Sequence, residues 1–121
     1  MDMKNKKIEK KLNTLDLILE TYDDVDFSIA DGLDDAVVGM DANNYVLIYD
    51  IEKCIQVMAK QMGITKKDLS EEEIEDGMTV ADKKYELAKE YFYFNTLNAY
   101  VEVKSEDGEV LSRPIFMDSQ F

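Results

Sequence analysis

The chain has 121 residues, 45% of them apolar, with 27 acidic and 14 basic side chains and a net charge of -13 at pH 7. This length is typical of one domain with its own hydrophobic core. The sequence contains one cysteine and no histidine, which excludes an internal disulfide, Ser-His-Asp and Cys-His nucleophile systems, and zinc sites built from several thiolates or imidazoles.

The first predicted element is a helix from about Lys4 to Thr21. Its apolar residues recur at spacings of 4, 3, 4 and 3, at Ile8, Leu12, Leu15, Leu19 and Tyr22, which is one face of a helix. We expect this face to pack on the domain's own core, and a homodimer seam is the alternative. The helix should end near Tyr22–Asp24, where Asp-rich sequence favours a turn, and the lysine-rich residues 1–11 should fray.

A hairpin should follow the first helix. Val25–Ile29 alternates in part and predicts a short edge strand, and Asp31-Gly32 predicts a turn. The apolar runs Ala36–Met40 and Tyr45–Tyr49 are separated by turn-forming residues, so they predict a β-hairpin.

Asp50 is the expected N-cap of a second helix, and Gly63 its expected stop. The apolar residues of this helix fall at i, i+3, i+4, i+7 and i+11, at Ile51, Cys54, Ile55, Met58 and Met62. We expect these side chains to be buried against the later aromatic residues Tyr91, Phe92 or Phe94. Cys54 on this face should be an inert core residue.

Capping pairs mark two further helices. Ser70 with Glu73 predicts a short helix over Glu71–Asp76, ended by Gly77, and Thr79 with Asp82 starts a longer one from Val80 to about Tyr100. A hairpin with its turn at 106–108 should join strands at 100–104 and 109–117, and Pro114 restricts the last strand to an edge or an end.

Strands and helices are therefore segregated along the chain, which predicts a small single α+β domain over residues 1–121, with an N-terminal helix and antiparallel β-hairpins packed against two or three helices.

The aromatic run Tyr91-Phe92-Tyr93-Phe94 cannot occupy one face of a helix. We interpret it as the wide apolar surface of a helix packed between two elements, with Asn95 a buried polar residue that needs partners. Stacking on single-stranded bases is the alternative. It is disfavoured because Lys83, Lys84 and Lys89 lie among acidic residues.

Charge is distributed unevenly. Residues 12–52 contain eleven acidic side chains and neither lysine nor arginine, whereas residues 1–11 have a net charge of +3 and residues 53–121 one of -5. A solvated face that keeps the protein soluble is the ordinary explanation, and a surface matched to a basic protein partner is the functional one. Direct nucleic-acid binding is disfavoured because it needs a basic footprint.

The candidate partner-binding residues lie in this acidic stretch. They are Asp23, Asp24, Asp26, Asp31, Asp34, Asp35 and Asp41. The alternative is a carboxylate-based metal enzyme acting on nucleotides, centred on Asp31, Asp34 and Asp35, because hard cations prefer several oxygen ligands. The EF-hand pattern fails, since placing Gly32 at its sixth position puts Phe27 at the first. We therefore predict no metal ion, no cofactor and no catalytic residue.

Three blocks together resemble a family of short, uncharacterised bacteriophage-encoded proteins. They are DGLDDAVVG at 31–39, VLIYDIEKCI at 46–55, and EYFYFN at 90–95 followed by AYV at 99–101 and PIF at 114–116. The chain departs from that pattern in a longer first helix, an added acidic segment around Lys66–Asp76 and a longer hairpin before Pro114. The resemblance implies a viral origin and action inside an infected bacterium, and it carries no catalytic residues.

Together these features predict a small acidic phage protein in the host cytoplasm that binds a host or phage protein. Inhibition of a nucleic-acid-binding or defence enzyme by DNA mimicry is its most concrete form, and a virion or scaffold component is a further alternative. We expect no membrane association, because no apolar run approaches the roughly 20 residues of a membrane span.

Overall fold

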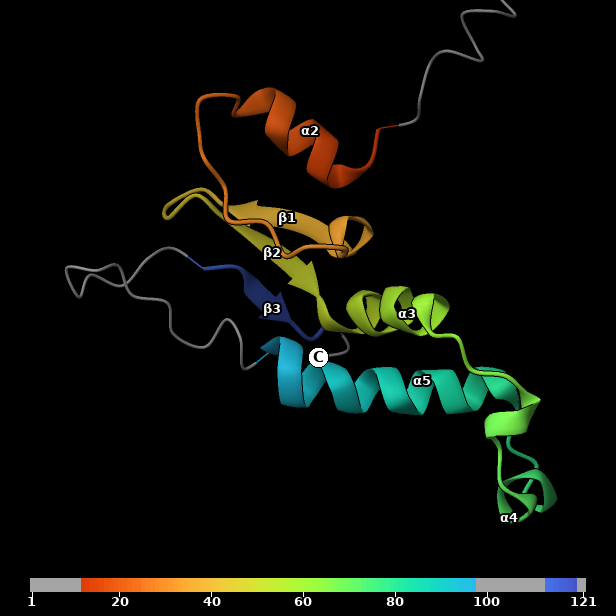
Figure 1. The fold of residues 1–121 in the computed structure, drawn as a ribbon. Coiled ribbons are helices and arrows are strands. Elements are labelled where there is room, and N and C mark those ends of the chain that lie inside the picture. Colours follow the sequence, from red (N-terminus) through yellow and green to blue (C-terminus); the bar gives the residue numbers. More distant parts are fainter. Residues whose placement is uncertain (1–11, 98–112, 120–121) are drawn as a thin grey trace, which may run out of the picture.

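The computed structural model describes residues 12–97 and 113–119, and Figure 1 shows their arrangement. The elements in chain order are α2 (Thr14–Thr21), β1 (Val37–Asp41), β2 (Val46–Asp50), α3 (Ile51–Gln61), α4 (Glu71–Glu75), α5 (Val80–Tyr91) and β3 (Ile115–Met117). The predicted α+β class is confirmed. The first turns of the N-terminal helix and the hairpin turn at 106–108 lie outside the described residues.

The sheet has the order β1-β2-β3. β1 and β2 form the predicted antiparallel hairpin, and β2 is the central strand, with four of its five residues buried. β3 pairs parallel with β2, Ile115 lying opposite Ile48, so the expectation of antiparallel pairing alone is wrong. Pro114 directly precedes this edge strand, as its missing N–H requires.

α2 begins later than its apolar spacing suggests. The Asn13 side chain accepts a hydrogen bond from the Asp16 N–H at 2.8 Å, and the Asp16 carboxylate accepts one from the Asn13 N–H. This capping box starts the helix at Thr14, so the prediction of one helix running through Leu12 is wrong, and Leu12 is 45% exposed. Leu15 and Ile18 are buried, and the end near Tyr22 is confirmed.

The segment between α2 and β1 contains no strand at Val25–Ile29, which corrects the predicted edge strand. Its buried side chains are Phe27, Ala30, Leu33 and Ala36, every third residue, while Ile29 is exposed. A β-ladder would need burial of every second residue. The turn at Asp31-Gly32 is confirmed, and Gly32 has a left-handed φ of 80°.

α3 begins at its predicted cap, because the Asp50 carboxylate accepts a hydrogen bond from the Lys53 N–H at 3.0 Å. Cys54 and Ile55 are buried, whereas Ile51, Met58 and Met62 are only half-buried, so the predicted burial holds for two of the five. The helix ends at Gln61 because the backbone of Met62 adopts an extended conformation.

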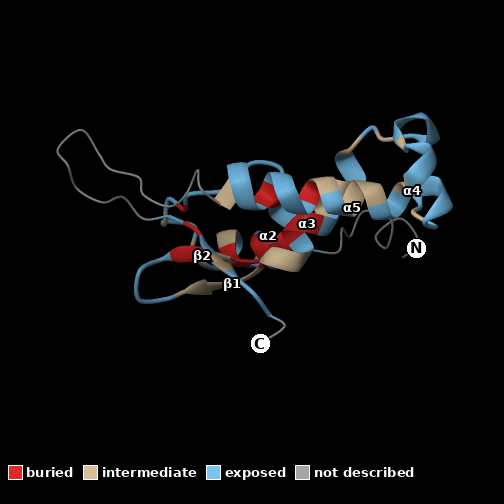
Figure 2. Cartoon of the chain, turned by 90° about the horizontal axis from the view of Figure 1, so that it is seen from below, coloured by how far each residue is buried: buried red, intermediate tan, exposed pale blue. Residues whose placement is uncertain are grey.

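The other two predicted capping pairs are confirmed. Ser70 with Glu73 caps α4, and Thr79 with Asp82 caps α5. The Lys83 ammonium lies 2.6 Å from the Glu73 carboxylate and joins the two helices. α4 lies at the end of α5 far from the sheet and is largely exposed, whereas the buried residues gather between the strands, α2, α3 and the end of α5 (Figures 1 and 2).

Candidate interaction surface

The acidic segment, residues 22–35, presents a row of carboxylates to solvent. Its six acids are all exposed: Asp23, Asp24, Asp26, Asp31, Asp34 and Asp35. They alternate with the buried side chains of Phe27, Ala30 and Leu33, which anchor the segment in the core. The acids therefore lie on a fixed stretch of backbone.

Two contacts place the segment along the sheet. Near its start, the Tyr22 ring lies edge-on to Tyr45 of the hairpin turn, with ring centroids 6.2 Å apart. Further along, the Tyr49 hydroxyl of β2 accepts a 2.8 Å hydrogen bond from the Ala30 N–H. The segment thus runs from the hairpin end of the sheet toward α3, as Figure 1 shows.

Asp41 lies outside this row, at the end of β1. Its carboxylate accepts hydrogen bonds from the Asn43 N–H at 2.9 Å and the Asn44 amide at 3.0 Å. These bonds hold the pKa of Asp41 below its usual value, so this carboxylate builds the hairpin turn. Since Tyr22 contacts that turn, Asp41 lies at the same end of the sheet as Asp23.

Other acids of the 12–52 stretch have structural roles. Asp50 is 4% exposed. Burial would raise its pKa, but the polar groups of Ser119, the Lys53 N–H and the Lys53 charge outweigh burial and lower it. Glu52 accepts a hydrogen bond from the Tyr85 hydroxyl at 2.7 Å, which raises the pKa of Tyr85. The eleven acids therefore do not form one continuous face.

The end of the row near α3 lies close to two lysines. A hollow of about 400 Å³ is lined by Asp35 together with Lys53 and Lys60 of α3. The Asp35 carboxylate also lies 3.5 Å from the Asn13 amide nitrogen. Among the residues that the structure describes, Asp23, Asp24, Asp26, Asp31 and Asp34 make no ion pair.

No group of three or more Asp, Glu, Cys or His side chains is arranged to hold a metal ion within residues 12–97 and 113–119. Asp31, Asp34 and Asp35 are close in sequence, but they do not form such a group. The Cys54 thiol is buried, and burial followed by the nearby Asp50 charge raises its pKa to about 12. Its burial is as predicted.

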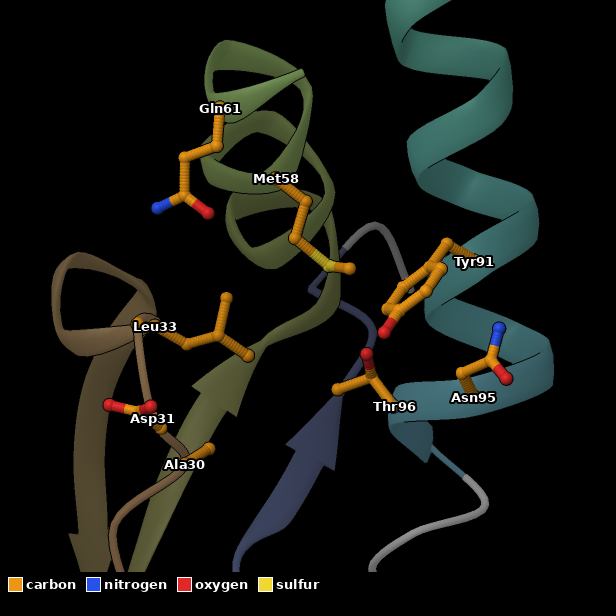
Figure 3. A pocket seen from close by; sticks show the side chains of 9 residues that line it. Ala30, Asp31, Leu33, Met58, Gln61, Tyr91, Asn95 and Thr96 are labelled. Atoms are coloured by element: carbon orange, nitrogen blue, oxygen red, sulfur yellow. The ribbon is translucent and has the colours of Figure 1, made fainter. Parts of the chain in front are cut away.

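Two adjacent hollows lie between the acidic segment, α3 and α5, and we call them together the α3–α5 groove. One, of about 350 Å³, is lined by Asp31, Leu33, Met58, Tyr91 and Thr96 among others. The other, of about 370 Å³, is lined by Met62, Leu87, Glu90, Tyr91, Phe94 and Asn95. In Figure 3, Leu33, Met58 and Tyr91 converge from three elements, and the Asp31 carboxylate is turned away from them.

The aromatic run Tyr91-Phe92-Tyr93-Phe94 is mostly exposed, whereas the sequence predicted that it is buried. Only Phe92 is buried, at 0% exposure, and its ring packs on Phe116 with centroids 5.5 Å apart. Tyr91 is 52% exposed and Phe94 is 70% exposed, and Tyr93 and Asn95 are exposed as well. The prediction that the whole run and Asn95 belong to the core is therefore wrong.

A change of helical pitch accompanies this exposure. Phe92–Thr96 continues α5 as a π-helical turn, a feature often found at functional sites. One face of the combined helix, at Tyr85, Ala88 and Phe92, packs on the core. A second face, at Leu87, Tyr91 and Phe94, lines the groove. The spacing i, i+4, i+7 of this second face was visible in the sequence.

Comparison with protein-family models, with curated proteins and with solved structures gave no match. No helix in the described part of the chain is long and apolar enough to cross a membrane.

Proposed function

We propose that this protein acts by binding a protein partner that has a basic surface. The observation that supports the proposal is the acidic segment, where five exposed carboxylates, none in an ion pair with another described residue, lie on backbone anchored by Phe27, Ala30 and Leu33. A row of like charges on ordered backbone attracts an oppositely charged surface at long range and speeds association. An anchored row also loses little conformational entropy on binding.

The partner's chemistry follows from this charge. A protein groove that binds nucleic acid is lined with lysine and arginine, so it is the kind of surface that a row of carboxylates complements. The specific form of the proposal is an inhibitor that occupies the groove of a nucleic-acid-binding or defence enzyme in an infected bacterium. The phage setting rests on the sequence resemblance alone.

The test is affinity capture from infected bacterial cells with two variants of equal charge. In the first variant Asp23, Asp24, Asp26 and Asp34 become Asn, and among the described residues none of these side chains makes a hydrogen bond or ion pair. In the control, Glu71, Glu72 and Glu75 become Gln and Asp76 becomes Asn, all exposed on or beside α4. Surface changes of this kind alter stability little.

We call the first protein the acidic-segment variant and the second the α4 control. We expect the wild type and the α4 control to capture one partner that the acidic-segment variant captures less. Cross-links from the retained partner should map to its basic groove. Equal capture by all three proteins would overturn the proposal, since the charge of the acidic segment would then make no difference to binding.

A further inference from the structure

The α3–α5 groove is a second surface beside the acidic segment, and its lining is mainly apolar. Leu33, Met58, Met62, Leu87 and Tyr91 contribute to it from three elements. Each hollow falls in the range of about 300–1,000 Å³ that ligand pockets occupy. Methionine side chains adapt their shape and are frequent on surfaces that accept peptides.

The helix that forms one wall has more apolar surface than the described core covers. Phe92 and Ala88 are buried, yet Tyr91, a neighbour of Phe92 in sequence, is half-exposed on the groove. A helix that packs on one side only needs a single apolar stripe. The second stripe, at Leu87 and Tyr91, is only partly covered by the described residues and is available to a partner.

The charges of the groove indicate which partner. Among the residues that line the two hollows, the charged ones are Asp31 and Glu90, and both are acidic. The wall formed by the acidic segment continues into its row of carboxylates. A segment seated here would therefore meet apolar surface in the groove and negative charge at its rim.

We infer that the α3–α5 groove docks a basic amphipathic helix of the partner, with its apolar side chains in the two hollows and its lysines or arginines directed at Glu90 and the acidic segment. This is the helix-in-groove mode of peptide recognition. The inference rests on the proposed function and deepens it by naming the element of the partner that binds. Tyr91, which both hollows share, is the expected anchor, since aromatic residues dominate such contacts.

The probe is a synthetic peptide of about four helical turns, made of leucine and lysine with the leucines at helical spacing. The controls are the same peptide with glutamate for lysine, and one of identical composition with its leucines scattered around the helix. Binding to the full chain is followed by amide NMR shifts and by the dissociation constant.

We expect the lysine peptide alone to bind, with shifts at Gly32, Met62 and Asn95. Glu90→Lys should weaken binding of the lysine peptide. Glu86→Lys should have little effect, because it makes the identical change at an exposed position of α5 that lies outside both hollows. Tyr91→Ala should weaken binding at least about tenfold, as truncation of an interface anchor does, with an unchanged thermal midpoint of unfolding.

Three results would overturn the inference. They are no binding of the lysine peptide, equal binding of the glutamate or scattered peptide, and equal effects of Glu90→Lys and Glu86→Lys. The acidic-segment variant separates this failure from failure of the proposed function. If that variant loses the cellular partner while Tyr91→Ala and Glu90→Lys retain it, the proposed function stands and the groove is not the docking site.

Discussion

The hydroxyl of Tyr49 accepts a 2.8 Å hydrogen bond from the backbone N–H of Ala30, and both residues are buried. This bond joins the central strand to the middle of the acidic segment. The segment has no ladder of its own to satisfy its backbone, so a side chain of the sheet takes that role. This contact helps to position the carboxylates on either side of Ala30.

Tyr49→Phe should therefore destabilise the protein and loosen the acidic segment. The ring keeps its packing on Phe116, but the Ala30 N–H loses its acceptor inside the core. A buried donor left without a partner costs about 1–3 kcal/mol. Urea unfolding measures this loss, and faster hydrogen exchange at the Ala30 amide locates it. Tyr45→Phe, at an exposed position, is the control, and equal stability of the two variants would refute the role of Tyr49.

Ile55→Ala should lower the free energy of unfolding more than most other substitutions in α3. Ile55 is 2% exposed in the main core cluster, and truncation of such a side chain costs about 2–5 kcal/mol. Ile74→Ala removes the same atoms from an exposed position of α4 and should have little effect. Thermal unfolding compares the two, and an unchanged midpoint for Ile55→Ala would show that this core assignment is wrong.

The ion pair between Glu73 of α4 and Lys83 of α5 should make the free energy of unfolding depend on pH in the acidic range. The hydrogen bond from Lys83, helped by the Ser70 N–H, lowers the pKa of Glu73 from 4.5 to about 2. A lowered pKa in the folded state means that the stabilisation is complete above the unfolded value of 4.5 and is lost as the pH falls toward about 2.

Glu73→Gln keeps the shape of the side chain but removes this titration. Its stability should fall less steeply than that of the wild type between these two pH values, as measured by unfolding at a series of pH values. Parallel curves for the two proteins would mean that Glu73 does not contribute. Glu75→Gln, on the same helix, is the control.

Cys54 should be unreactive in the folded protein. The thiolate is the reactive form of cysteine, and burial raises the pKa of this thiol to about 12. A thiol reagent at mildly alkaline pH should label the native chain slowly and the urea-unfolded chain at one site per molecule. Fast labelling without denaturant would contradict the burial of Cys54.

Local signals in the sequence predicted helix starts and turns well. Ser70 with Glu73, Thr79 with Asp82, and Asp50 each satisfy N–H groups within three residues along the chain. Such contacts need no information from the rest of the fold. The start of α2 was missed because the apolar spacing through Leu12 outweighed the capping box that Asn13 forms with Asp16.

Long-range contacts were not predictable in the same way. β3 pairs parallel with β2 across more than sixty residues of chain, and no local pattern specifies such pairing. The acidic segment alternates like a strand at Val25 and Phe27, yet its backbone bonds to the Tyr49 hydroxyl instead of a ladder.

The candidate site likewise combines features that are visible in the sequence with features that only tertiary packing decides. The sequence identified the acids of residues 22–35, because charge is visible residue by residue. It did not identify the groove, because the aromatic run on α5 has two apolar faces and only tertiary packing decides that Phe92 is buried and Tyr91 exposed. That Asp50 and Glu52 belong to caps and contacts likewise became apparent only in the fold.

The rate of association with the captured partner, measured against salt concentration, tests the central claim most directly. Raising the ionic strength from about 0.1 M to about 1 M shortens the Debye length from about 10 Å to about 3 Å. The association rate constant of the wild type should then fall by about tenfold or more, while dissociation changes less. The variant with Asn at positions 23, 24, 26 and 34 should associate more slowly at low salt and depend less on salt, unlike the α4 control. Identical association rates for this variant and the wild type at every salt concentration would contradict the account.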